Sequence, residues 1–354
     1  MNRRSTIRSL IAAMAAMVLV AATACGGSDS KITTAQTGGA DAVTVRLGYF
    51  PNVTHATPIV GVDKGIYEKA LGENKLETVT FADGTAASEA LTAGAIDAAY
   101  IGPGPATNLF QKSGGEAIRI VSGAASGGAS LVVSSDIKTP ADLEGKTIST
   151  PKLGNTQDVA ARAWLEEQGF KTTLEGGGDV KIAPQENSLT LDAFKAGDID
   201  GAWVPEPWAS RLVLEGGGHE LLDEQELWPG GKFATTVLVV ATTFLEDHPD
   251  VVKQLLVGQI EASTYINDNS DEAKTITNAG IKKITDKALT PEVIDAAWEN
   301  LTFTDDPITS SIQKAAENAA SVELLDSSDI SGIYDLEALN DALEAAGEPT
   351  VTGA

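Results

Sequence analysis

The sequence is poor in the residue types that most often hold metals and cofactors. Its 354 residues include one cysteine, Cys25, and three histidines. A single cysteine excludes an internal disulfide and a cysteine-based metal site, and no two histidines have the spacing of paired metal ligands. We therefore expect neither a metal centre nor a cofactor.

Positive charge is scarce as well. The chain has 25 basic and 50 acidic residues, which gives a formal net charge of −25 at pH 7. The first 24 residues contain three arginines and no acid, so their removal would lower the charge to −28. This charge argues against nucleic acid and anionic lipid surfaces as partners, although a small anion can still bind in a local pocket.

The apolar run near the start of the chain is too short to cross a membrane comfortably. It extends from Leu10 to Ala22, about 13 residues, whereas a membrane-spanning helix needs about 20. Three arginines precede it and small residues follow it, which predicts a signal peptide over residues 1–24. Cleavage would place Cys25 at the new N-terminus.

Cys25 and the residues after it predict a membrane anchor and a tether. A lone cysteine directly after the expected cut resembles a bacterial lipoprotein, although Ala22 stands where a large aliphatic residue is usual. We expect lipid on Cys25; the alternative is an ordinary signal peptide followed by a chance cysteine. Residues 25–42 are rich in Gly, Ser and Thr, which is typical of a flexible tether.

Two similar stretches lie 103 residues apart, at Ala93 to Ala106 and Ala196 to Ala209. Each contains Gly-x-Ile-Asp, then a short apolar segment with an aromatic residue, then prolines. With expected strands at Val43 to Tyr49 and Lys146 to Thr150, each half of the repeat predicts strand, helix, strand, helix, strand. Such alternation is typical of parallel α/β sheets. The alternative is that Gly-x-Ile-Asp marks a common helix-to-strand turn and the match is chance.

The repeat predicts two lobes with a ligand cleft between them. We expect the first lobe at residues 43–128, the second at 129–230, and a return to the first lobe at 231–347. The expected crossings lie near 126–130 and 228–235. The return segment shows a buried strand at 234–242 and helices at 249–267, 291–300, 308–323 and 335–345.

Five motifs in register resemble a family of binding proteins that serve ABC importers of nitrate, taurine and aliphatic sulfonates. The motifs are Leu47 to Asn52 with Lys64 to Tyr67, Glu89 to Asp97, Leu143 to Ile148, Ala193 to Asp200, and Phe244 to Val252. Together they span about 200 residues, and Ile333 to Leu336 resembles the start of the family's closing helix. The resemblance implies a two-lobed type II periplasmic binding protein fold that closes around its ligand.

Ligands of open α/β sheets bind beyond the carboxyl ends of the strands, where helices begin. Helix N-termini supply hydrogen-bond donors and a favourable dipole, so an oxyanion needs no positively charged side chain there. We expect helix starts near Thr54, Pro103 and Thr156 to face the cleft. The candidate ligand-binding residues are Asn52, Thr54, His55, Gly102, Pro103, Asn155, Thr156, Gln157, Glu206 and Trp208.

Several of these residues have a second interpretation. The second interpretation of Thr54 and Thr156 is that each caps a helix and does not contact the ligand. The second interpretation of His55 is a packed or solvent-facing histidine. Trp208 is a candidate wall for an alkyl chain. Glu206 would repel an anion, so it either binds the ammonium group of a zwitterion such as taurine or turns away to another donor.

The sequence thus predicts a monomeric solute-binding lipoprotein on the outer face of the cytoplasmic membrane. It would capture a small oxyanion, an aliphatic sulfonate or taurine, and deliver it to the permease and ATPase subunits of an ABC importer. On the same fold, the alternatives are nitrate, bicarbonate or a thiamine-precursor pyrimidine. A pyrimidine-synthesising enzyme of related fold is a weaker alternative, because that enzyme uses a run of cysteines that this chain lacks.

Overall fold

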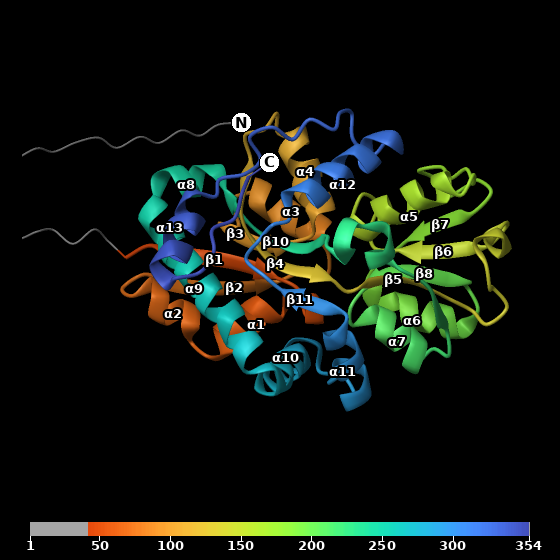
Figure 1. The fold of residues 1–354 in the computed structure, drawn as a ribbon, viewed down its shortest axis with the longest axis horizontal. Coiled ribbons are helices and arrows are strands. Elements are labelled where there is room, and N and C mark those ends of the chain that lie inside the picture. The colour runs from red at the N-terminus through yellow and green to blue at the C-terminus, as the bar shows by residue number, and fades with distance from the viewer. Residues whose placement is uncertain (1–41, 354) are drawn as a thin grey trace, which may run out of the picture. The chain divides into compact units, whose positions relative to one another are not determined.

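The computed structural model of the protein describes residues 42–353. The predicted signal peptide, Cys25 and nearly all of the predicted tether lie outside this range. The described residues contain two sheets and the helices that pack on them (Figure 1). None of these helices is both long and apolar enough to span a membrane.

The first sheet has six strands. Their spatial order is β2 (Lys75–Thr80), β1 (Thr44–Tyr49), β3 (Ala98–Ile101), β10 (Ala234–Ala241), β4 (Ile118–Gly127) and β11 (Leu301–Phe303). Strand β1 runs parallel to β2 and β3, whereas β10 runs antiparallel to β3 and β4. Strand β10 is the buried strand that the sequence predicts at 234–242.

The second sheet has five strands and repeats this arrangement. Their order is β7 (Lys181–Pro184), β6 (Thr147–Thr150), β8 (Gly201–Pro205), β5 (Ala129–Val133) and β9 (His219–Asp223). Strand β6 is parallel to β7 and β8, and β5 is antiparallel to β8. In both sheets, therefore, the first strand of the repeat lies between the second and third, which confirms the predicted α/β repeat.

Helices cover both faces of each sheet. The repeated helices are α1 (Ala56–Asp63), α2 (Ile66–Leu71), α3 (Gly84–Thr92) and α4 (Pro103–Lys112) on the first sheet, and α5 (Thr156–Glu167), α6 (Asn187–Ala196) and α7 (Trp208–Leu214) on the second. Strands β3 and β10 place alternate side chains in two separate apolar clusters, one on each face of the first sheet. Burial on both faces explains why β3 and the part of β10 from Val237 to Ala241 are continuously apolar.

The C-terminal part of the chain returns to the first sheet. It forms α8 (Thr242–Asp247), α9 (Pro249–Asp268), α10 (Ser270–Thr285), α11 (Pro291–Glu299), α12 (Thr309–Ser321) and α13 (Glu337–Ala346). Four of these match predicted helices, and α8 and α10 were not predicted. The buried residues of α10 are Ala273, Thr277 and Ile281, of which only Ile281 is a large apolar residue.

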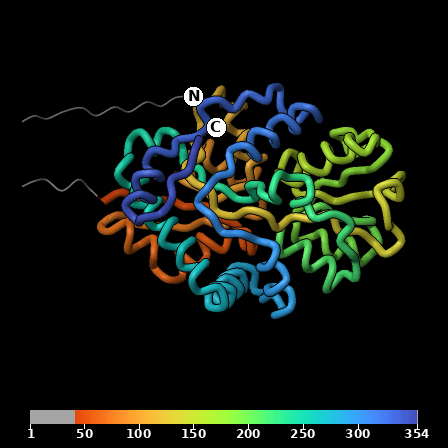
Figure 2. Tube along the Cα trace, in the orientation of Figure 1, coloured from red at the N-terminus to blue at the C-terminus, as the bar shows by residue number. Residues whose placement is uncertain are grey.

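The chain passes between the sheets twice (Figure 2). Strand β4 belongs to the first sheet and β5 to the second, and only Gly128 separates them. The return runs from β9 to β10 through two short 3-10 turns, Glu224–Leu227 and Pro229–Gly231.

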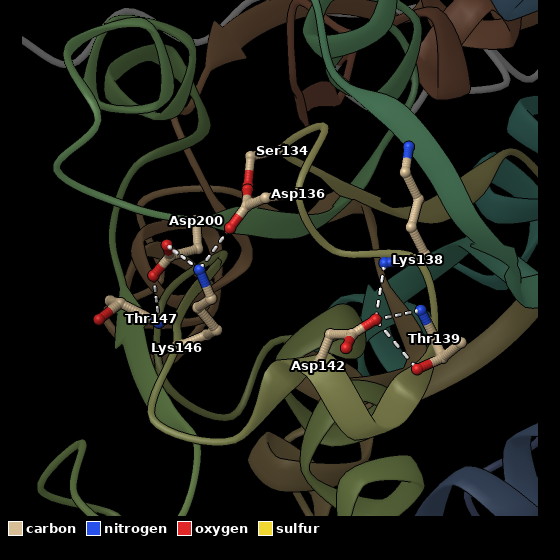
Figure 3. Close-up of polar contacts among 8 residues, drawn as sticks. All are labelled: Ser134, Asp136, Lys138, Thr139, Asp142, Lys146, Thr147 and Asp200. Atoms are coloured by element: carbon tan, nitrogen blue, oxygen red, sulfur yellow. Dashed lines mark hydrogen bonds and ion pairs between the residues drawn. The ribbon is translucent and has the colours of Figure 1, made fainter.

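The repeated Ile-Asp motif has a structural explanation. Asp97 accepts hydrogen bonds from the backbone N–H of Arg46, at 2.8 Å, and from Arg46 Nε, at 2.9 Å. Asp200 accepts from the backbone N–H of Thr147, at 2.8 Å, and from Lys146 Nζ, at 3.3 Å (Figure 3). In each half, the aspartate therefore ties the third strand of the repeat to the start of the first strand.

The two aspartates differ in burial, which predicts different effects of their removal. The side chain of Asp97 is 8% exposed and that of Asp200 is 35% exposed. Asp97→Ala leaves the Arg46 amide without a partner in a buried place, and we expect it to lower the free energy of unfolding by about 2–3 kcal/mol. Asp200→Ala removes the acceptor of the Thr147 amide and of Lys146 at a partly exposed place, where water can replace it, and should cost about 1 kcal/mol or less.

Urea denaturation of both variants measures this difference. An equal loss for the two variants would contradict the assignment of the motif to a buried strand-to-strand tie.

Candidate functional site

A small polar cavity of about 40 Å³ lies between the two sheets, at the carboxyl ends of β1, β3, β6 and β8. We call it the inner cavity. Seven of the ten candidate residues line it: Asn52, Thr54, His55, Gly102, Asn155, Thr156 and Gln157. No lysine or arginine is among its lining residues.

Five helices begin at the inner cavity, namely α1, α3, α4, α5 and α6. The first-turn amides of a helix lack intrahelical acceptors, and the helix dipole adds partial positive charge at this end. Helix α4 contributes no free amide, because residues 103 and 105 are prolines and the Gly104 N–H donates to Thr156 Oγ1 at 3.1 Å. The amides that remain for a ligand come chiefly from the first turns of α5 and α6.

Four side chains of the inner cavity have a buried polar atom without a hydrogen-bond partner among the described residues. These atoms are His55 Nε2, Gln157 Nε2, Thr236 Oγ1 and Asn187 Oδ1. His55, Gln157 and Thr236 are 3%, 4% and 1% exposed, respectively, and each of these three can donate. Because an unsatisfied buried polar group is costly, the convergence of three donors on one cavity indicates a place for a ligand that accepts hydrogen bonds.

His55 is electrically neutral in this environment. Burial lowers the pKa of its imidazole to about 3, against an ordinary value of 6.5. Its Nδ1 lies 3.1 Å from Thr54 Oγ1, and its ring packs on Phe50 with centroids 4.4 Å apart. A neutral imidazole that carries its proton on Nε2 can donate one hydrogen bond into the cavity.

Thr54 and Thr156 are not helix caps. Thr54 lies inside a short 3-10 turn, Val53–His55, and α1 begins after it. Thr156 is the first residue of α5, whose N-cap is Asn155, and the Thr156 hydroxyl accepts the hydrogen bond from Gly104 instead. The expected capping role is therefore wrong for both residues.

Asn155 and Thr156 join the two sheets across the cavity. Asn155 Oδ1 accepts a hydrogen bond from the Gly84 N–H at 3.2 Å, and Asn155 Nδ2 donates to Thr85 Oγ1 at 3.1 Å. Together with the bond from Gly104 to Thr156, these contacts hold the start of α5 against the starts of α3 and α4. The cavity is thus enclosed by residues of both sheets.

A larger cavity of about 290 Å³ adjoins the inner cavity and shares Asn52, Ala82 and Asn187 with it. We call it the outer cavity. Trp208, Leu191, Leu289 and Ile281 form much of its wall, and Arg211 and Lys287 supply cationic groups. Its size and its mixture of apolar wall and polar groups suit an organic group attached to a polar head.

Two candidate residues line neither cavity. Pro103 is buried as the first residue of α4. Glu206 accepts hydrogen bonds from Ser210 Oγ at 2.9 Å and from Asn300 Nδ2 at 2.8 Å. Of the two interpretations of Glu206, this agrees with the one in which its carboxylate turns to other donors. Burial raises the pKa of the Glu206 carboxyl above its ordinary value, although these donors oppose the shift.

Sequence reasoning left nine lining residues of the inner cavity out of the candidate set, among them Asp83 and Gly84 at the start of α3, Asn187 at the start of α6, and Thr236 on β10. The repeat contained a signal for two of them, because the 103-residue offset relates Gly84 to Asn187, just as it relates Asn52 to Asn155. No local signal marks Thr236, which reaches the cavity only because β10 returns antiparallel to β3.

Nowhere in residues 42–353 do three or more His, Cys, Asp or Glu side chains gather into a group that could hold a metal ion.

Comparison with known proteins gives a family and related structures. The sequence model of the NMT1-like family matches residues 38–280. A taurine-binding periplasmic protein of Escherichia coli (strain K12) is 34% identical over 142 residues, which are 40% of this chain and 42% of that protein.

Solved structures share the fold across most of the chain. The periplasmic nitrate-binding protein NrtA of Synechocystis PCC 6803 has a TM-score of 0.76 at 18% identity, with 87% of this chain and 90% of that chain covered. The alkanesulfonate-binding protein SsuA of Xanthomonas axonopodis pv. citri, bound to MOPS, has a TM-score of 0.68 at 18% identity, with 89% and 100% covered. These likenesses confirm the two-lobed fold of periplasmic binding proteins.

The close approach of α4 and α5 predicts the effect of adding one methyl group at Gly104. A Cβ there would lie 2.8 Å from Thr156 N and 3.0 Å from Gly154 O, both backbone atoms that cannot rotate away. Gly104→Ala should therefore oppose closure and weaken ligand affinity by about tenfold or more, because overpacking of this kind typically costs 1–3 kcal/mol.

Thermal unfolding and calorimetric titration of Gly104→Ala test this expectation, with Lys112→Ala on the same helix as the control. If the two sheets move apart when no ligand is bound, the added methyl group meets no backbone atom there. Alanine then favours the helix over glycine, and the unliganded variant should unfold at the same temperature or higher. Undiminished affinity in Gly104→Ala would show that ligand binding does not need the close approach.

Proposed function

Because the chain belongs to the NMT1-like family, we propose that it is the solute-binding protein of an ABC importer and captures a small organic oxyanion, an aliphatic sulfonate above all. The proposal includes closure of two lobes around the ligand, residues 43–128 with 231–347 and residues 129–230. It assigns the protein no enzymatic activity.

The main support for this proposal is the set of unpartnered donors in the inner cavity. A sulfonate head has three oxygens that accept hydrogen bonds and one negative charge. His55 Nε2, Gln157 Nε2 and Thr236 Oγ1 can each donate one bond, and the first-turn amides of α5 and α6 can donate more. The helix dipoles favour the negative charge without a cationic side chain.

The outer cavity favours an organic anion as the ligand over nitrate or bicarbonate. Nitrate and bicarbonate would occupy only the inner cavity and leave about 290 Å³ beside it unfilled. An alkyl chain can extend from the inner cavity past Asn52 and lie along Trp208 and Leu289. Each methylene that leaves water for this wall contributes about 0.8 kcal/mol.

Taurine is a candidate beside the unsubstituted alkanesulfonates. Its ammonium group needs an acceptor near the head group. The carboxylate of Glu206 already has Ser210 and Asn300 as partners, whereas Asn187 lines both cavities and its Oδ1 has no partner among the described residues. Asp83 lines the inner cavity, but its Oδ1 caps α3 by accepting hydrogen bonds from Thr85 and Ala86. Nitrate remains the second candidate, because the inner cavity is small and NrtA shares the fold.

Export and membrane attachment complete the proposal. A signal peptide at residues 1–24 and lipid on Cys25 would hold a monomer at the outer face of the cytoplasmic membrane. There the closed form would meet the permease, which the ATPase subunits drive. Release of a Cys25→Ser variant from the membrane fraction tests the anchor, and unchanged membrane association would exclude it.

Calorimetric titration of the purified protein with a ligand series tests the proposed ligand. The series is methanesulfonate, hexanesulfonate, taurine, nitrate, bicarbonate and an aminopyrimidine. We expect affinity to rise from methanesulfonate to hexanesulfonate by up to about fourfold per methylene. Nitrate and bicarbonate should bind more weakly than hexanesulfonate.

Variants of the donors locate the bound head group. His55→Ala and Gln157→Ala should each weaken sulfonate binding by about tenfold or more, because each removes a hydrogen bond to a charged acceptor. Thr277→Val is the matched control, since Thr277 also has a buried hydroxyl without a partner but lines neither cavity. Binding of the aminopyrimidine with no response to any oxyanion would exclude the sulfonate proposal.

A further inference from the structure

Asn52 occupies the boundary between the two cavities. It follows β1, it is 7% exposed, and it lines both the inner and the outer cavity. A ligand with its head in the inner cavity and its chain in the outer cavity must pass this residue. The orientation of the Asn52 amide therefore decides whether the ligand meets a donor or an acceptor at the boundary.

Trp208 fixes that orientation. Its indole Nε1 donates to Asn52 Oδ1 at 3.1 Å. An indole N–H can only donate, so it must face the amide oxygen and not the amide nitrogen. The Asn52 NH₂ group has no hydrogen bond to another residue in the described part of the chain, which leaves its protons available at the cavity boundary.

The indole of Trp208 is itself held in place. The guanidinium of Arg211 lies over the ring, 4.7 Å from its centroid, and Arg211 pairs with Glu215 at 3.1 Å. A planar cation on one face of the ring restricts the rotation that would break the bond to Asn52. The donor of this bond is thus positioned from within α7.

The bond also joins the two sheets. Trp208 begins α7 on the second sheet, whereas Asn52 follows the first strand of the first sheet, 156 residues earlier. The bond can form only when these two parts of the chain are together. Closure would therefore create the oriented donor as well as enclose the ligand.

We propose that Trp208 is a positioning residue, which turns the Asn52 amide so that its NH₂ group donates to the head group of the bound oxyanion in the closed form. This inference rests on the proposed function and adds a specificity element to it. Trp208 then has two separable roles: its N–H acts through Asn52 on every oxyanion, and its ring contacts only ligands with a chain.

A double-mutant cycle on the full chain separates the two roles. Trp208→Phe, Asn52→Ala and the double variant are titrated with methanesulfonate, which has no chain to contact the ring, and with hexanesulfonate. We expect Trp208→Phe to weaken methanesulfonate binding by about five- to tenfold, as for the loss of one hydrogen bond. In the Asn52→Ala background the same change should have no further effect, because Trp208 acts through Asn52.

Two further variants test whether a change in affinity comes from an effect on folding. Trp298→Phe makes the same chemical change at a residue that lines neither cavity, and it should alter affinity by less than about twofold. Asn52→Asp keeps an acceptor for the indole but replaces the donor by an oxygen, so it should abolish sulfonate binding while the unliganded protein unfolds at its usual temperature.

Three results would overturn the inference. Additive effects of Trp208→Phe and Asn52→Ala would mean that the two residues act independently. Weaker binding of hexanesulfonate alone in Trp208→Phe would mean that the ring is only a wall. Absence of binding of either sulfonate to the wild-type protein would reject the proposed function as well, whereas additivity with intact wild-type binding rejects only the role of Trp208.

Discussion

The convergence of helix N-termini on a cavity without a positive side chain is the feature on which the rest of the proposed site depends. Parallel strands end there in both sheets, and α1, α3, α4, α5 and α6 begin there, so that five helix N-termini meet. The dipole of one helix is worth only about 0.3–1 kcal/mol toward a nearby anion at an exposed position. In the proposed function, convergence of several helices on a cavity lined by buried side chains makes this weak effect sufficient to bind an anion.

Convergence in turn depends on contact between the two sheets. The starts of α3 and α4 meet the start of α5 through Gly84, Gly104, Asn155 and Thr156, with hydrogen bonds of 3.1–3.2 Å. These contacts consume several of the amides that the helix starts would otherwise offer. Where these amides are already used, unpartnered side chains such as His55 and Gln157 remain as donors at the inner cavity.

Much of this arrangement could be predicted from the sequence, because the repeat encodes it twice. The Ile-Asp motif and the alternating strands predicted the parallel sheets, and the carboxyl-end rule then brought Asn52, His55 and Gln157 together. The capping role of Thr54 and Thr156 could not be judged, since it depends on where a 3-10 turn ends and on a contact 52 residues away. Thr236 and the partner of Trp208 depend on tertiary pairing, for which the local sequence has no pattern.

The central claim, that neutral donors and helix dipoles hold the anion, is tested most directly by the pH dependence of affinity. A pKa of about 3 keeps His55 neutral above pH 5, and no lysine or arginine lines the inner cavity. Calorimetric affinity for hexanesulfonate should therefore change by less than about twofold between pH 5.5 and 8.5. An increase of about tenfold as the pH falls through 6.5 would show that a protonated His55 binds the anion, and it would contradict this account.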